Sequence, residues 1–270
     1  MDPDVVAETA EAEETRRTSR RYRRVPTSLL SLALFFLTWT VAAWWAHDPD
    51  VPTPFAVAAF MAREAANGDL FYHLSITLAR VAAAFVVSMA VGTAIGLAMG
   101  QWREIDRWLD PWLILLINMP ALVLIVLCYI WIGLSEAAAI TAVALNKTPN
   151  VVITLREGAR ALDPKLAEMA RVYRFSRLAL VRDVMLPQLQ PYIAAASRSG
   201  LALIWKIVLV VELLGRSNGV GFQIHLYFQL FDVTAILGYA FAFVAVMIAI
   251  EYMLVQPLET RLTRWRAKPA

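Results

Sequence analysis

Residues 168–187 read EMARVYRFSRLALVRDVMLP. This basic, helix-forming segment separates two long apolar runs, although a connection that only reversed the chain could be far shorter. The surrounding chain has 270 residues, of which 59% are hydrophobic and 17% are charged. Soluble domains carry about 25% charged residues. The composition therefore predicts a membrane protein in which the charged segment has a purpose of its own.

Two short helices are predicted in and just before this segment. Asp163 and Pro164 mark the first start, because Asp accepts hydrogen bonds from free N–H groups and Pro suits the first turn. Ser176 can cap a second helix over residues 177–185, which is expected to stop before Pro187. The helices could lie on the membrane surface with their arginines toward lipid phosphates. They could instead dock into a groove on a cytoplasmic partner.

Six apolar segments are long enough to cross a membrane as helices, which takes about 20 residues. They are residues 27–46, 81–102, 111–135, 137–155, 191–211 and 233–250. The sequence thus predicts an all-α integral membrane protein with six transmembrane helices. The first segment follows an arginine cluster and has no clear A-x-A cleavage site, so we interpret it as an uncleaved signal-anchor.

The basic residues are distributed unevenly between the two sides of the predicted membrane. Nineteen Lys and Arg residues fall in the two tails and in the loops on one side, whereas the alternate loops hold only three, Arg63, Arg80 and Arg216. Loops rich in Lys and Arg stay in the cytoplasm. We therefore expect both termini to be cytoplasmic, with a disordered basic tail at 1–26 and a further tail at 258–270. Residues 156–190 would form a cytoplasmic loop.

Several kinds of chemistry are not supported by the sequence. Cys128 is the only cysteine, which excludes an internal disulfide and a cysteine-based metal cluster. No Gly-Lys pair exists to build a phosphate-binding loop for ATP. No group of His, Asp, Ser or Cys has the spacing that an intramembrane enzyme needs. We expect no catalytic residue, no metal and no cofactor in this chain.

Glycines and basic residues within the spans have simple structural interpretations. Gly92, Gly96 and Gly100 lie four residues apart, so they share one helix face and predict close packing on a neighbouring helix. Lys147 and Arg198 lie nearer the cytoplasmic ends of their spans. We expect both side chains to snorkel toward the membrane surface.

Five residues are candidates for lining a translocation pathway: Asn118, Met119, Pro120, Lys206 and Glu212. Pro120 removes a helix hydrogen bond and predicts a kink, either structural or beside a cavity. Lys206 lies near the middle of its span, where a charge costs about 2.5–3.5 kcal/mol and usually faces protein or water. It could attract a passing anion, or be neutralised by a carboxylate or carbonyls on another helix. Glu212 is expected in a turn at the extracytoplasmic mouth.

The charged segment resembles a known motif. EMA at 168–170 and V-x-LP at 184–187 resemble the EAA…G…I-x-LP loop of permease subunits of bacterial ABC importers. WK at 205–206, ELLG at 212–215 and GVG at 219–221 are similar to the nitrate/sulfonate/taurine branch of that superfamily. The resemblance covers most of the chain.

The resemblance implies a MetI-like permease core with five helices within residues 70–257, in a bacterial inner membrane, after a first transmembrane helix at 27–46. It implies a homodimer of permeases, a cytoplasmic ATPase dimer that hydrolyses the ATP, and an extracytoplasmic solute-binding protein. The solute would be small and mostly anionic, such as a sulfonate, taurine or nitrate. The implied ATPase-coupling residues in the loop 156–190 are Glu168, Met169, Ala170, Arg171, Val172, Tyr173, Arg174, Leu186 and Pro187.

Arg174 stands where the family pattern has glycine. Glycine would end the first short helix in the left-handed conformation, which costs another residue about 1–2 kcal/mol. Either Arg174 bears this cost, or the joint between the two short helices is reshaped.

An ion-coupled secondary transporter that acts without an ATPase is the alternative. Such proteins usually have inverted repeats and acidic sites at the membrane midplane. The sequence gives no sign of either, and a docking loop would serve no purpose in a transporter that acts alone.

Overall fold

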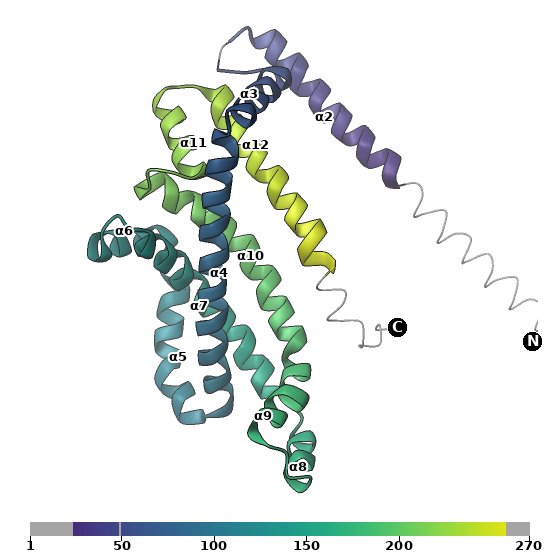
Figure 1. Cartoon of the computed structure of the whole chain (residues 1–270), viewed down its shortest axis with the longest axis vertical. Helices are drawn as coiled ribbons and strands as arrows, with labels where there is room; N and C mark the ends of the chain where they lie inside the picture. The colour runs from purple at the N-terminus through teal and green to yellow at the C-terminus, as the bar shows by residue number, and fades with distance from the viewer. Residues whose placement is uncertain (1–23, 49, 258–270) are drawn as a thin grey trace, which may run out of the picture.

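The computed structural model describes residues 24–48 and 50–257, and this part of the chain contains only helices and their connections (Figure 1). The predicted tails lie almost wholly outside the described residues. The helices are α2 Arg24–Ala46, α3 Pro54–Asn67, α4 Asp69–Gln101, α5 Arg103–Asn118, α6 Ala121–Ile132, α7 Glu136–Arg160, α8 Pro164–Val172, α9 Arg177–Ala179, α10 Leu186–Gly215, α11 Val220–Gln229 and α12 Val233–Ile250, with π-helical turns η1 Leu180–Met185 and η2 Glu251–Val255. The all-α class is confirmed.

Four helical stretches are long and apolar enough to cross a membrane: α4, α7, Arg177–Gly215 and Val233–Met253. The predicted span 111–135 is wrong as a single straight helix, because α5 and α6 meet at an angle of 102°. Counted as one broken span, this bent pair brings the number among the described residues to five. The apolar part of α2, Leu30–Ala46, is shorter, so the sixth span stays a prediction.

Helices α4 and α7 pack closely, as the glycine spacing predicted. A Cβ atom added to Gly92 would lie 2.6 Å from Cβ of Val151, and one added to Gly96 would lie 2.7 Å from the carbonyl oxygen of Val152. Gly100 faces Arg156 and Ala159 in the same way. The three glycines therefore let the two backbones approach each other.

The second short helix continues past Pro187, contrary to the predicted stop. Residues 177–215 form one continuous helical stretch, which includes the π turn η1. In this wider turn the N–H of Leu186 donates to Val181 O, and the side-chain Nε2 of Gln188 donates to Val184 O at 2.8 Å. The π turn accommodates a proline that an ordinary α-helix would exclude.

The largest core lies where α3, α11 and α12 meet α4, α7 and α10, at the end of the molecule opposite α8 (Figure 1). Tyr239 is fully buried there, and its hydroxyl donates to Glu64 Oε2 at 2.7 Å. In contrast, α2 points away from the body, and among residues 30–46 only Ala43 is buried (Figure 1). The body of the fold is therefore built from α3 onward.

Candidate functional site

The connection between α7 and α10 projects from the end of the helical body (Figure 1). Asp163 Oδ1 accepts a hydrogen bond from the N–H of Lys165 at 2.8 Å and caps α8. Ser176 Oγ accepts from the N–H of Ala179 at 3.2 Å and caps α9. Both predicted helix starts are confirmed.

Arg174 forms the joint between the two short helices and adopts φ of +51°. Its N–H donates to Arg171 O at 3.0 Å, and the next N–H, of Phe175, donates to Ala170 O at 2.9 Å. These bonds satisfy the last carbonyl groups of α8, as a glycine would allow. Of the two alternatives, the structure supports the first: Arg174 bears the cost of the left-handed conformation.

Arg174→Gly is therefore expected to stabilise the joint. Relief of the left-handed strain gains about 1–2 kcal/mol, and the greater freedom of glycine in the open loop offsets about 0.5–1 kcal/mol of it. Amide hydrogen exchange of residues 170–176 in the membrane-embedded protein should slow by a factor of a few. Arg177→Gly, in the first turn of α9, should have the opposite effect. Unchanged or faster exchange in Arg174→Gly would contradict the strain.

The residues implied in ATPase coupling form a surface that the protomer leaves uncovered. Within 168–174 only Ala170 is buried, whereas Val172 is 79% and Tyr173 is 73% exposed. Leu186 is also exposed and Pro187 is half-buried, at the start of α10. Exposed apolar groups on a projecting helix are typical of a surface that a partner covers.

The projecting connection is tied to the body at both ends. The backbone N–H of Asp163 donates to Gln188 Oε1 at 2.9 Å, which joins the start of α8 to α10. At the end of α7, Arg156 pairs with Asp110 at 2.6 Å and Arg160 pairs with Asp106 at 2.5 Å. These ion pairs join the same end of α7 to α5.

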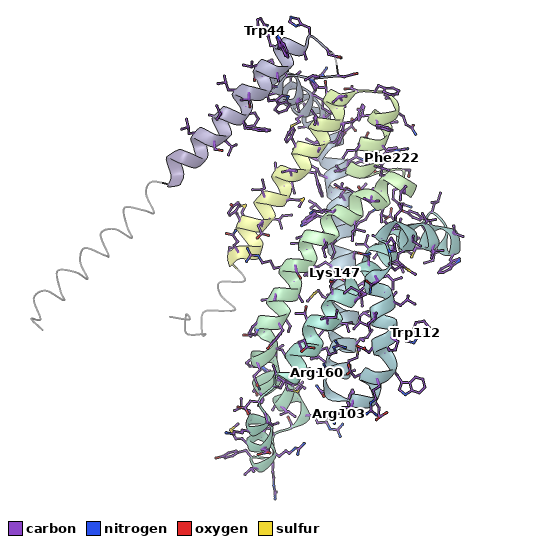
Figure 2. All side chains as sticks on the ribbon, turned by 180° about the vertical axis from the view of Figure 1, so that it is seen from behind. Trp44, Arg103, Trp112, Lys147, Arg160 and Phe222 are labelled. Carbon is purple, nitrogen blue, oxygen red and sulfur yellow. The ribbon has the colours of Figure 1, made fainter. Side chains whose placement is uncertain are left out.

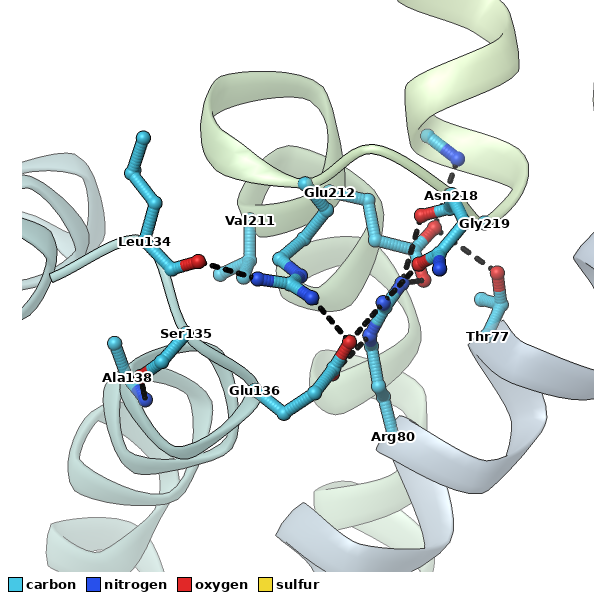
Figure 3. Close-up of polar contacts among 12 residues, drawn as sticks. Thr77, Arg80, Leu134, Ser135, Glu136, Ala138, Val211, Glu212, Asn218 and Gly219 are labelled. Atoms are coloured by element: carbon cyan, nitrogen blue, oxygen red, sulfur yellow. Dashed lines mark hydrogen bonds and ion pairs between the residues drawn. The ribbon is translucent and has the colours of Figure 1, made fainter.

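A largely buried polar cluster (Figure 3) lies where α10 ends and α11 begins, toward the end of the molecule opposite α8 (Figure 1). Arg80 of α4 donates to Glu212 Oε1 at 2.7 Å, to Glu136 Oε1 at 2.6 Å and to the Asn218 carbonyl at 2.8 Å. Glu212 is fully buried and also accepts from Thr77 Oγ1 at 2.9 Å. The cluster thus joins α4, α7, α10 and the turn before α11.

The same cluster holds the start of α11. The N–H of Gly219 donates to His73 Nδ1 at 3.0 Å, that of Val220 to Thr77 Oγ1 at 2.9 Å, and that of Gly221 to Glu212 Oε2 at 2.8 Å. The first N–H groups of a helix have no partner within that helix. Here side chains of α4 and α10 supply those partners.

Sequence reasoning missed Arg80 and misplaced Glu212. Arg80 directly precedes the predicted span 81–102, and an arginine inside an apolar helix is itself a signal, because it must find partners within the protein. Glu212 was expected in a turn, but α10 continues to Gly215. Its carboxylate faces the cluster and no open surface of the protomer.

The two lysines within the spans lie in opposite surroundings. Lys206 is exposed on α10 and has no ion-pair partner among the described residues. Lys147 of α7 is only 1% exposed and lies in the middle of the helical body (Figure 2). The predicted snorkelling of Lys147 is therefore wrong, because its side chain packs against Gly200. Arg198 is half-exposed and lies 3.7 Å from Glu251.

The break between α5 and α6 contains the other pathway candidates. Asn118 is exposed and its amide donates to Ile114 O at 2.7 Å, Met119 is extended, and Pro120 is exposed before α6. The predicted effect of Pro120 on the helix is confirmed as a full break. Whether these residues face the solute stays a prediction.

The several apolar helices long enough to cross a membrane define the class of a multi-pass membrane protein. Residues 88–255 match the family described as "Binding-protein-dependent transport system inner membrane component". The chain belongs to this family and is the permease subunit of an ABC importer, a transport subunit and not an enzyme.

Named relatives agree with this assignment. The chain is 36% identical over 202 residues to the putative aliphatic sulfonates transport permease protein SsuC of Escherichia coli, which covers 72% of this chain and 77% of that protein. It is 30% identical over 216 residues to the putative aliphatic sulfonates transport permease protein SsuC of Bacillus subtilis, and the match covers 80% of this chain and 78% of that protein. It is 27% identical over 256 residues to the taurine transport system permease protein TauC of Escherichia coli, covering 91% and 92%.

Solved structures share the fold. A chain of an amino acid ABC transporter crystallised with histidines superposes with a TM-score of 0.58 at 22% identity, over 75% of this chain and 98% of that chain. A chain of the MetNI methionine ABC transporter in an inward-facing conformation also superposes with a TM-score of 0.58. Its identity is 16%, over 73% of this chain and 95% of that chain. The MetI-like architecture implied by the sequence is therefore confirmed.

Proposed function

We propose that the chain forms the translocation pathway of an importer for a small anion of the sulfonate, taurine or nitrate class. The observation that carries this proposal is Lys206, which is exposed on a membrane-spanning helix and has no ion-pair partner in the part of the chain that the structure describes. A charge at such a position faces protein or water and not lipid. A second permease copy on this face of α10 would enclose Lys206 in a polar path that attracts anions. The names of the sulfonate and taurine relatives support the same solute class.

In this proposal α8 is the coupling helix, gripped by a separate ATPase. Val172, Tyr173 and Met169 would fill an apolar groove, with Glu168, Arg171 and Arg174 around them. Leu186 and Pro187 close the loop at the start of α10. The ion pairs between α7 and α5 would carry the movement of α8 into the body when ATP is bound and hydrolysed.

The proposed complex contains two copies of this permease, an ATPase dimer and a solute-binding protein. The excess of Lys and Arg on the α8 side supports cytoplasmic termini, with α8 facing the ATPase. The binding protein would then dock at the opposite end of the molecule, near α3 and α11. Solute would pass from that protein into the path between the two permeases.

Growth of a strain that lacks this gene tests the proposed function. Taurine or ethanesulfonate as the only sulfur source and nitrate as the only nitrogen source form the panel. Loss of growth on one of these, restored by the intact gene, identifies the solute. Lys206→Arg should also restore growth, because it keeps the charge, whereas Lys206→Gln should restore it poorly at low solute. Equal restoration of growth by both variants would show that the charge of Lys206 has no role in the path of the anion.

A further inference from the structure

Lys147 has a buried ammonium group without a partner. Its Nζ atom makes no hydrogen bond within the described residues, and the residue is 1% exposed. The side chain lies against Gly200 of α10, where an added Cβ would come within 2.7 Å of Lys147 Cε and 3.5 Å of Nζ. An unpaired ammonium inside a membrane protein is strongly unfavourable. Residues 24–48 and 50–257 of the protomer therefore leave this group unsatisfied.

A polar face of α7 borders Lys147. Since a helix turns by about 100° per residue, Asn146 and Asn150 lie on one side of Lys147, and Val151 and Leu155 on the other. The two asparagines are half-buried, whereas Val151 and Leu155 are fully buried against α4. Polar and apolar surroundings therefore meet at Lys147.

Around Gly200 on α10 the exposed residues are separated from the buried ones. Ser199, Leu203 and Lys206 lie on one side and are exposed, whereas Ile204 and Val208 lie on the other side and are buried. Gly200 itself has no side chain between Lys147 and the exposed side. An ammonium at Lys147 therefore lies next to the polar side of α7 and the exposed side of α10, which carries Ser199 and Lys206.

The polar side of α7 and the exposed side of α10 coincide because the two helices are antiparallel. Glu136 in the first turn of α7 pairs with Arg216, the residue that follows α10. Seen from one end, successive residues of two antiparallel helices run around their axes in opposite directions. Residues that precede Lys147 and Gly200 by about 100° of helix rotation therefore lie on the same side of the contact between α7 and α10. We call this region the polar seam and define it by Asn146, Asn150, Ser199 and Lys206. Lys147 lies at its floor.

We propose that Lys147 contacts the anionic group of the transported solute from the floor of the polar seam, as a second ammonium in addition to Lys206. This inference rests on the proposed transport of an anion. The solute would supply the counter-charge that the protomer lacks, and Gly200 would leave the passage between them open. Two separate contacts favour passage, because an anion can leave one while it gains the other.

Charge restoration at a cysteine tests this role in the complete importer. Cys128 is the only cysteine of the chain, so Cys128→Ala gives a background in which Lys147→Cys is the one thiol of this subunit. Uptake of taurine, ethanesulfonate and nitrate is measured per amount of importer in the membrane. Lys147→Cys should reduce uptake about tenfold, the size expected for a lost charge-assisted contact. Treatment with 2-aminoethyl methanethiosulfonate, which adds an ammonium, should restore most of it, and methyl methanethiosulfonate should not.

Two further variants separate a contact with solute from mere filling of space. Lys147→Met keeps the volume of the side chain and should be as defective as the untreated cysteine variant. Val151→Cys faces α4 and should respond to neither reagent. The inference would be overturned if Lys147→Met takes up solute at the unaltered rate. It would also be overturned if the Lys147→Cys thiol does not react, or if it gains the aminoethyl group and uptake does not recover. If the unaltered importer takes up none of the three anions, the proposed function fails and this inference falls with it.

Discussion

Arg80→Met is expected to destabilise the folded protein by about 3–5 kcal/mol, because removal of one partner leaves a buried carboxylate without its counter-charge. Glu212 is fully buried and its ion-pair partner in the cluster is Arg80. Its remaining hydrogen bonds, from Thr77 and from the N–H of Gly221, do not carry a full positive charge. Glu136 still pairs with Arg216, so the loss is concentrated at Glu212.

Unfolding of the purified importer in detergent measures this effect. Glu212→Gln combined with Arg80→Met should recover part of the loss, since the carboxylate is then replaced by a neutral amide of similar shape. Arg107→Met is the control, because its ion pair with Glu104 is 76% exposed on both sides and such pairs contribute little. If Arg80→Met unfolds like the control, the cluster does not hold α4, α7 and α10 together.

Val172→Asp is expected to reduce solute uptake by at least about tenfold, since a buried carboxylate without a partner costs several kcal/mol. Val172 is 79% exposed in the protomer, so the substitution leaves the permease fold itself intact. We expect the cost to arise only when α8 enters the proposed apolar groove of the ATPase. Stimulation of ATP hydrolysis by the loaded binding protein and co-purification of the ATPase measure the loss.

Leu178→Asp is the matched control for this prediction. Leu178 is 77% exposed on the same connection but lies outside the proposed coupling residues. Its substitution should leave uptake close to the unaltered level. Equal effects of the two variants would favour the alternative in which the whole connection lies on the membrane surface, because both aspartates would then meet the same lipid.

Local features of this chain were predictable because neighbouring residues determine them. The caps at Asp163 and Ser176 form with residues two or three positions away. The glycine face of α4 follows from a spacing of four residues. At Arg174, a position that favours glycine, the sequence left two alternatives, and the structure supports the strained one. The membrane class and an interruption of the helix at Pro120 were predictable for the same reason.

The resemblance of residues 168–187 to the importer loop is also a local feature of the sequence. Its pattern is short and continuous in the sequence, so it identified the family before any packing was known. The proposed coupling surface is formed by neighbouring residues of one short helix, so it does not depend on packing against distant parts of the chain. Its apolar groups project because α8 lies outside the helical body (Figure 1).

Only the tertiary structure shows which partners and surroundings the charged side chains within the spans have. Arg80 and Glu212 are 132 residues apart, and nothing local to either residue pairs them. Lys147 was expected to reach the membrane surface, but Gly200, which no sequence pattern linked to it, leaves room for its side chain inside the body. A sequence fixes which charges must find partners, because bare charges are unfavourable in lipid. Which helices supply those partners depends on how distant segments pack, and that information appears only when the chain is folded.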